Sequence, residues 1–376
     1  MIRKNQIPTV VDLFAGAGGL SEGLKKAGFN SILANEYDEM AATTFKHNHP
    51  SVPILVKDIR DLSVDEIFQI TGKKEGEISL VCGGPPCQGF SLAGPRMADD
   101  PRNIMFKEFV RIVDGLKPSI FLFENVSGIM SMSGGAVLKA IVQEFTDIGY
   151  NCGYQLLNAA DYGVPQARPR FILIGVRDGQ HIGFPQQTHT AERKPNGDLF
   201  AGQLKKHLTV WDAISDLPVI YQGDGTEEMT STSNYVNAYQ AERRGNRHPG
   251  LVFNHRATKH SEKIVERYAA IPEGKNGAHL PEELRTKKVN VFKLDREKPA
   301  RTITCNHRTD ILHPVIPRGT TVREAARLQS FDDDYQFFGN LTRKAKFVTQ
   351  DDQVGNAVPP LLAKAIGEHI KKSMKW

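Results

Sequence analysis

The sequence has few cysteines and no closely spaced pair of them. Four cysteines occur among 376 residues, at positions 82, 87, 152 and 305, and none forms a CxxC pair. This pattern indicates neither a disulfide framework nor a zinc site, and it favours a reducing compartment. No apolar run approaches the roughly 18 residues that a membrane span needs, and the N-terminus lacks the apolar core of a signal peptide. We therefore expect a cytoplasmic protein without membrane contact.

A strong net charge is also missing. The formal charge is +5, with 24% charged and 40% hydrophobic residues, which is the balance of an ordinary globular protein. A weak positive charge is compatible with a polyanionic partner but does not indicate one. The length allows one large domain and a second, smaller one. Composition therefore leaves the partner open.

The N-terminal region predicts a binding element for a nucleotide-like ligand. Residues 8–14, PTVVDLF, have the pattern of a buried strand, which leads into the glycine-rich segment 15–19 and a helix over 20–27 closed by Gly28. Glycines at such a turn let backbone N–H groups approach a ligand. Ser21 occupies the third glycine position of the dinucleotide fingerprint, so pyrophosphate binding is not indicated.

Acidic and reactive residues follow four of the strands that the sequence predicts. Alternating strand and helix patterns predict an α/β fold with a doubly wound, mostly parallel sheet, and the carboxyl ends of such strands line the ligand crevice. Glu36, which could accept the hydroxyls of a ribose, has an equally good alternative as a solvated strand-end acid. Taken together, these residues predict one cleft: Glu36, Asp58, Cys87 and Glu124.

Cys87 is the candidate nucleophile. It lies in Glu77 to Ser91, EISLVCGGPPCQGFS, where an apolar strand leads into Gly-Gly-Pro-Pro. A single cysteine in a globular protein is more often a buried, inert side chain. The flexible glycines, the stiff prolines and the polar Gln88 favour presentation of the thiol on a loop.

The pattern changes between Asp178 and Lys298. Pro, Gly, Asn and Thr become frequent and periodicity is poor, which indicates an inserted, loop-rich second domain. Its scattered basic clusters could contact phosphates or could be ordinary solvated surface. Its histidines form no metal-ligand pattern. Regular pattern returns at RTIT (301–304) and in the segment GNAVPP that precedes the last helix.

These motifs together resemble those of bacterial DNA (cytosine-5) methyltransferases. DLFAGAGG, NEYD, GGPPCQGFS, ENV, QARPR, RTIT and GNAVPP occur in that family's order and cover nearly the whole chain outside its middle. The resemblance implies a Rossmann-like catalytic sheet with a smaller target-recognition domain inserted before the C-terminal segment. The implied division is a catalytic, S-adenosylmethionine-binding part at 1–185, target recognition at 186–320, a hinge at 321–350 and a returning catalytic segment at 351–376.

The resemblance also implies a cofactor site for S-adenosylmethionine, with S-adenosylhomocysteine as product and no metal. Glu36 would bind the ribose, Asp58 and Ile59 the adenine, and the remaining positions the rest of the pocket. The implied cofactor residues are Phe14, Gly16, Gly18, Leu20, Glu36, Asp58, Ile59, Pro85, Met105, Asn356 and Val358.

In the implied chemistry, Cys87 adds to C6 of a cytosine flipped out of duplex DNA, because the aromatic C5 is otherwise a poor nucleophile. Glu124 would stabilise the charge that develops at N3, assisted by Arg168 and Arg170, which two-residue spacing on one strand would place on the same face. A surface ion pair is the alternative for the arginines. The implied DNA contacts are Ser91, Arg102, Arg301 and Thr302.

The implied partner is double-stranded DNA, bound by a monomer that could belong to a restriction-modification system with an independent cognate endonuclease. Two rivals remain, a methyltransferase acting on RNA and a DNA-binding protein that kept the fold without catalysis. A nicotinamide-dependent dehydrogenase is disfavoured by Ser21, and it leaves the PPCQ segment without a role.

Overall fold

A computed structural model of the chain describes residues 7–86, 104–177, 179, 181–191, 204–231, 234–245, 250–342 and 347–376. The chain forms two compact units. The first comprises Met1–Asn158, Pro169–Gln186 and Leu362–Trp376, and the second comprises Ala159–Arg168 and Gln187–Leu361. The domain boundaries expected at 185, 320 and 350 stay predictions, because compactness does not define a recognition function.

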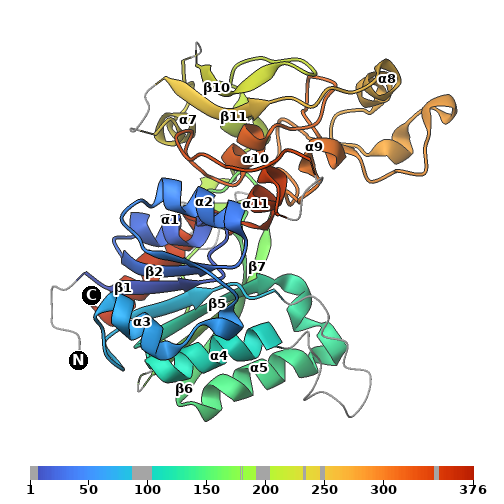
Figure 1. Cartoon of the computed structure of the whole chain (residues 1–376). Helices are drawn as coiled ribbons and strands as arrows, with labels where there is room; N and C mark the ends of the chain where they lie inside the picture. Colours follow the sequence, from blue (N-terminus) through green and yellow to red (C-terminus); the bar gives the residue numbers. More distant parts are fainter. Residues whose placement is uncertain are drawn as a thin grey trace. The chain divides into compact units, whose positions relative to one another are not determined.

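The first unit is built on one seven-stranded sheet, with the order β3-β2-β1-β4-β5-β7-β6 (Figure 1). β1 to β5 are parallel, and β7 runs antiparallel to both of its neighbours. The predicted mostly parallel, doubly wound sheet is confirmed. The strands are β1 Thr9–Leu13, β2 Asn30–Glu36, β3 Ile54–Val56, β4 Leu80–Gly83, β5 Ile120–Val126, β6 Tyr150–Asn158 and β7 Pro169–Arg177.

Helices cover both faces of this sheet. α3, α4 and α5 pack on the face that carries the largest hydrophobic core cluster. α1 and the C-terminal helix α12 pack together on the other face, where Gly367 lies against Leu24. Local signals explain several helix starts, since Asp38 caps α2 and Ser63 caps α3. The helices are α1 Gly19–Lys26, α2 Glu39–Asn48, α3 Val64–Thr71, α4 Ile104–Leu116, α5 Ala136–Asp147 and α12 Pro360–Met374.

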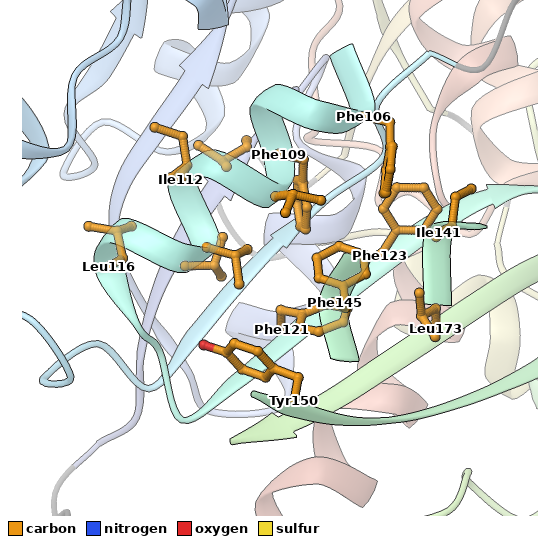
Figure 2. Close-up of a cluster of buried hydrophobic side chains, with 14 of the residues drawn as sticks. Phe106, Phe109, Ile112, Leu116, Phe121, Phe123, Ile141, Phe145, Tyr150 and Leu173 are labelled. Atoms are coloured by element: carbon orange, nitrogen blue, oxygen red, sulfur yellow. The ribbon is translucent and has the colours of Figure 1, made fainter. Parts of the chain in front are cut away.

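Interlocking aromatic rings fill the core beside β5 (Figure 2). Phe121 of β5 stacks on Phe145 of α5 with a centroid separation of 3.9 Å, and Phe109 of α4 meets both rings edge-on. Phe123, the next inward-facing residue of β5, packs on Phe109 and Phe106. Such packing fixes the strand that delivers Glu124 to the edge of the sheet.

The second unit has little regular sheet. Its longest strands form an antiparallel pair, and α10 packs against β11 and α6. No helix within the described residues is both long and apolar enough to span a membrane. The elements are β8 His189–Thr190, β9 Lys205–Lys206, α6 Val210–Ile214, β10 Gly225–Thr230, α7 Ala238–Arg243, β11 Leu251–Arg256, α8 Glu262–Ala270, β12 Phe292–Lys293, α9 His307–Asp310, β13 Ile311–Leu312, α10 Val322–Leu328 and α11 Gln350–Asn356.

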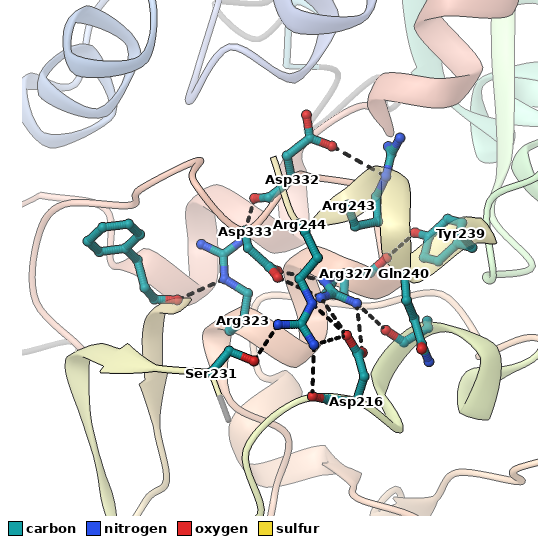
Figure 3. A network of polar contacts seen from close by, with 12 residues as sticks. Asp216, Ser231, Tyr239, Gln240, Arg243, Arg244, Arg323, Arg327, Asp332 and Asp333 are labelled. Carbon is teal, nitrogen blue, oxygen red and sulfur yellow. Dashed lines mark hydrogen bonds and ion pairs between the residues drawn. The ribbon is translucent and has the colours of Figure 1, made fainter. Parts of the chain in front are cut away.

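Buried charges hold the second unit together (Figure 3). The fully buried Arg327 of α10 donates to Asp216 at 3.0 Å and to Asp333 at 2.5 Å. Arg244, which follows α7, adds a contact of 2.7 Å to Asp216. Arg323, one helical turn before Arg327, donates to three backbone carbonyls. These groups fasten α6, α7 and α10 to the loop that follows α10.

Replacing Arg327 by Met tests this network. The change removes the cation that pairs with both buried carboxylates and leaves Asp216 with Arg244 alone, so we expect it to lower the free energy of unfolding by about 3–5 kcal/mol. Urea denaturation of the full chain measures the loss. Arg296→Met is the matched control, because Arg296 pairs with Glu273 at a site where its side chain is 45% exposed, and it should cost less than about 1 kcal/mol. Equal losses in the two variants would contradict a stabilising network.

Candidate active site

The carboxyl ends of the five parallel strands meet at one edge of the sheet. Leu13 of β1 pairs with both Asn35 of β2 and Gly83 of β4, and Gly83 pairs with Phe123 of β5. Glu36 at the end of β2 pairs with Val56 of β3. The residues that come next along each strand therefore follow one another along this edge, which is where doubly wound sheets bind their ligands.

The turn between β1 and α1 has an unusual backbone. Phe14, Gly16 and Gly18 all have left-handed angles, with φ of 56°, 55° and 90°. A left-handed angle costs Phe14 roughly 1–2 kcal/mol, a strain that is typical of binding turns. Gly18 is the N-cap of α1 and no side chain caps this helix end. The backbone N–H groups of the first turn therefore suit a polar or anionic ligand group.

Glu36 supports this turn from the neighbouring strand. Its Oε2 accepts a hydrogen bond of 2.7 Å from the Gly16 N–H, and its Oε1 accepts one of 2.8 Å from the Asp38 N–H. Burial raises the pKa of the Glu36 carboxyl, and these backbone N–H groups oppose that rise. The carboxylate is thus fixed beside the turn by backbone N–H groups.

Ser21 has a structural role that its departure from the glycine pattern did not reveal. Its hydroxyl donates to Oδ2 of the buried Asp12 at 2.6 Å, which ties the first turn of α1 to β1. Burial raises the pKa of the Asp12 carboxyl to about 7, and the bonds from Ser21 and Cys82 oppose this rise. The Asp12 carboxyl therefore changes charge near neutral pH.

The predicted adenine residues lie at the end of β3. Asp58 caps the short 3-10 helix η1 (Ile59–Asp61) and pairs with Arg60 at 2.6 Å. This bond lowers the pKa of the Asp58 carboxyl. Ile59 is 2% exposed and belongs to the core cluster of the sheet. Their contact with an adenine ring stays a prediction.

Glu124 lies at the end of β5 with its carboxylate in a defined position. It is 8% exposed, and its Oε1 is 2.9 Å from Nε of Arg170 on the adjacent β7. Burial lowers the pKa of the Arg170 guanidinium, and Glu124 opposes that shift. A nearly buried carboxylate held by one arginine is suited to sharing a proton or stabilising charge in a reacting ring.

The chain after β4 passes directly against this carboxylate. A Cβ added to Gly84 would lie 2.7 Å from Oε2 of Glu124, so only glycine permits the observed approach. Asn125, which follows Glu124, donates from Nδ2 to the carbonyl of Pro85 at 3.0 Å. Both contacts place the segment that leads to Cys87 beside Glu124. Cys87 itself lies outside the described residues, as do Ser91 and Arg102.

Arg168 lies directly before β7, which begins at Pro169, and its pairing with Arg170 on one strand face stays a prediction. Arg168 is 1% exposed, and its guanidinium donates to the carbonyls of Ile303, Gly355 and Ala357 at 2.8, 2.6 and 3.1 Å. These bonds join three separate segments of the second unit. They give Arg168 a structural role, and its predicted catalytic role stays a prediction.

The remaining predicted residues fall into two groups. In the first unit, Leu20 and Pro85 are buried and Met105 packs against the core cluster. In the second unit, Asn356 accepts a hydrogen bond from the Cys305 thiol, with 3.2 Å between Sγ and Oδ1, and Val358 is buried.

The two predicted DNA contacts that the structure describes are also in the second unit. Thr302 donates from its hydroxyl to the Ala167 carbonyl at 2.9 Å. The exposed Arg301 lies over the Phe292 ring, with its guanidinium 5.1 Å from the ring centre. Both contacts are within the protein, so the binding of DNA by these two residues stays a prediction.

Two residues at the strand ends were missed from the sequence. Asn125 anchors the segment after β4, and its place directly after Glu124 in ENV was the available signal. Tyr37 follows Glu36 in NEYD and is 66% exposed beside the turn, which suits an aromatic face for a ligand ring. Within the described residues, no group of three or more His, Cys, Asp or Glu side chains is arranged to hold a metal ion.

A doubly wound sheet with a glycine turn, a strand-end acid and an arginine-held carboxylate defines an α/β enzyme of the nucleoside-cofactor class. Residues 8–372 match the family described as C-5 cytosine-specific DNA methylase, and the chain belongs to this family. It is therefore a methyltransferase that acts on carbon 5 of cytosine in DNA, and enzymes of this family take the methyl group from S-adenosylmethionine. The predicted family and activity are confirmed.

Individual relatives agree with this assignment. The chain is 39% identical to the Type II methyltransferase M.DdeI of Desulfomicrobium norvegicum, covering 96% of this chain and 88% of that protein. It is 37% identical to M1.HphI of Haemophilus parahaemolyticus, covering 97% and 87%. Among solved structures, a candidate DNA modification methyltransferase from an E. coli prophage aligns with a TM-score of 0.77 at 28% identity, covering 98% and 100%.

The raised pKa of Asp12 predicts a pH-dependent stability. A carboxyl whose pKa is about 7 in the folded chain and 3.8 in the reference state stabilises the fold below pH 4 and loses that contribution as the pH rises through 7. Asp12→Asn keeps an acceptor for Ser21 but cannot ionise. We expect the difference in free energy of unfolding, variant minus wild type, to be a few kcal/mol higher at pH 8 than at pH 4. Urea unfolding across this pH range measures it.

Comparing the two proteins isolates Asp12, because all other titrating groups are common to both. Ser21→Ala is the matched control, since it removes the hydrogen bond and leaves the carboxyl able to titrate. An identical pH dependence in the wild type and Asp12→Asn would contradict the raised pKa.

Proposed function

We propose that the chain methylates carbon 5 of a cytosine flipped out of duplex DNA, with Cys87 as nucleophile and Glu124 and Arg170 as its catalytic partners. The observation that carries the proposal is the contact of Gly84 with the Glu124 carboxylate. Asn125, directly after Glu124, bonds Pro85, which precedes Cys87 by two residues in the sequence.

The cofactor site is proposed along the other strand ends. The uncapped N-terminus of α1 and the strained turn at Phe14 would receive the polar tail of S-adenosylmethionine, and Glu36 would accept the ribose hydroxyls. Asp58 and the exposed Tyr37 would flank the adenine. The cofactor, when bound, supplies an electrophilic methyl group on a sulfonium. The product would be S-adenosylhomocysteine, and no metal takes part.

The reaction requires a nucleophile and an acid that act on the same cytosine ring. The Cys87 thiolate forms a bond to C6, and the electron pair of the C5–C6 double bond moves into the ring toward N3. Glu124, held by Arg170, places a proton at N3 and so stabilises that charge. C5 then carries the nucleophilic pair that accepts the methyl group. Loss of the C5 proton to a base finally expels the Cys87 sulfur, N3 returns its proton to Glu124, and the aromatic ring is restored.

The second unit is proposed to grip the duplex. Flipping a base costs a few kcal/mol, so contacts to the DNA backbone must offset it. The similarity to Type II methyltransferases supports a place in a restriction-modification system, with a cognate endonuclease acting independently and the methyltransferase acting as a monomer.

The first experiment is to find the target. Bisulfite sequencing of DNA from cells that express the chain should show protected cytosines within one short sequence. Labelled methyl from S-adenosylmethionine should enter duplex DNA containing this sequence and should not enter tRNA. Incorporation into tRNA alone would replace the proposal with RNA methylation.

A duplex carrying 5-fluorocytosine at the target position then tests the nucleophile. Fluorine at C5 cannot leave as a proton does, so we expect a covalent complex of protein and DNA, visible in a denaturing gel and mapped by mass spectrometry to Cys87. Cys87→Ser should form no complex and should lose at least about 1,000-fold in rate, while still binding the duplex.

Cys305→Ser is the matched control, because Cys305 is half-buried and bonded to Asn356. It should retain the covalent complex. A wild-type enzyme that methylates its target without forming the complex would contradict the proposed role of Cys87.

A further inference from the structure

A buried carboxyl joins the strand and the helix that the glycine turn connects. Asp12 lies on β1 two residues before Phe14, and it is 1% exposed. Its Oδ2 accepts the hydrogen bond from the Ser21 hydroxyl in the first turn of α1. The segment between these two residues contains the left-handed backbone at Phe14 and the helix end at Gly18 that no side chain caps. The carboxyl is therefore bonded across both ends of the turn.

The ionised form of Asp12 has no counter-charge within the described residues. Its Oδ1 is buried and accepts no hydrogen bond from them. Cys82, its partner in the register of β4, carries a thiol, which is a weak donor. Burial also holds the pKa of this thiol well above its ordinary value, so the thiol itself stays neutral. A single hydroxyl, that of Ser21, is thus the main support for the Asp12 charge.

A second acid lies beside the same turn. Glu36 is bonded to the Gly16 N–H, and the groups that influence its pKa include no cation among the described residues. Burial raises the pKa of Asp12 to about 7, and repulsion from Glu36 adds to this rise. Two buried acids beside one binding turn favour a ligand that carries positive charge, because such a charge stabilises the ionised form.

The cofactor and its product differ in this charge. S-adenosylmethionine has a sulfonium, whereas the sulfur of S-adenosylhomocysteine is uncharged. Both molecules share the adenosine and the amino-acid tail, so Glu36 and the N-terminus of α1 meet the same groups in each. Only a group that responds to the sulfonium charge can distinguish the two molecules at this turn.

We propose that Asp12 loses its proton to solvent when S-adenosylmethionine occupies the turn, and that the resulting carboxylate favours the sulfonium cofactor over its product. The inference rests on the proposed cofactor site and adds a residue that determines its specificity. Asp12 acts through its charge and through Ser21, so it is a positioning residue and not a catalytic one. After methyl transfer the stabilising charge is gone. Asp12 then takes a proton back from solvent, and the product is bound less tightly.

The ratio of two affinities tests this coupling. Titration calorimetry measures the Kd of the full chain for S-adenosylmethionine and for S-adenosylhomocysteine from about pH 5.5 to about pH 8.5. The affinity for the cofactor should rise relative to that for the product by about 5-fold or more, with most of the change at or below about pH 7. The cause is the growing fraction of ionised Asp12.

Asp12→Asn keeps an acceptor for Ser21 but cannot ionise. Its affinity ratio should lose this rise, and any titration of the ligands themselves cancels in the comparison with the wild type. Glu22→Gln is the matched control, because Glu22 follows Ser21 on α1 and its carboxylate already pairs with Lys25 and Lys26. This control should keep the wild-type pH dependence. Thermal unfolding checks that each variant is folded. An equal pH dependence in the wild type and Asp12→Asn would overturn the proposal.

Proton release provides a measurement on the wild type alone. The heat of binding at pH 7 in two buffers of different ionisation enthalpy gives the number of protons released, corrected for the titration of each free ligand. The cofactor should release up to about 0.5 proton more than the product, because about half of the Asp12 carboxyls are still protonated at this pH. Equal release by the two ligands would overturn the coupling.

Failure of the proposed cofactor site is distinguishable from failure of this inference. A wild type that binds neither ligand would contradict the site, and the role of Asp12 with it. A wild type that binds both ligands with a pH-independent ratio of affinities would contradict the role of Asp12 and leave the proposed site in place.

Discussion

The active edge of this protein depends on the close approach of Gly84 to the Glu124 carboxylate. β4 and β5 are in register through Gly83 and Phe123, so the chain leaving β4 must pass the side chain that leaves β5. Glycine permits the approach, and Arg170 keeps the carboxylate from turning away. The aromatic core beneath β5 makes this arrangement rigid. The segment that leaves β4 and the Glu124 carboxylate are thereby brought to one place.

Much of this edge was predictable from the sequence. Short apolar runs followed by Glu36, Asp58 and Glu124 indicate parallel strands with polar ends, and the structure places each acid at a strand end as predicted. Ser21 and Asn125 show what local pattern misses. Their partners, Asp12 and Pro85, lie 9 and 40 residues away in the chain, and only the folded register makes these contacts visible.

The second unit was described from sequence only as rich in loops, and its stabilising interactions explain why. Buried ion pairs and hydrogen bonds from side chains to the backbone stabilise the second unit. The first unit is built on a sheet, whose strands leave a periodic pattern in the sequence. The sequence does not show whether an arginine is buried or exposed. Spacing along a strand gave no sign that the Arg168 guanidinium donates to the carbonyls of two other segments, at Ile303 and at Gly355 and Ala357.

The most direct measurement is single-turnover methyl transfer by Gly84→Ala, with Gly128→Ala as the comparison. A methyl group at Gly84 would lie 2.7 Å from Oε2 of Glu124 and must displace that carboxylate, whereas nothing lies within 4 Å of a methyl group at Gly128. The account predicts that Gly84→Ala binds S-adenosylmethionine normally and loses at least about 100-fold in the rate of transfer, while Gly128→Ala keeps the wild-type rate. A wild-type rate in Gly84→Ala would contradict the account.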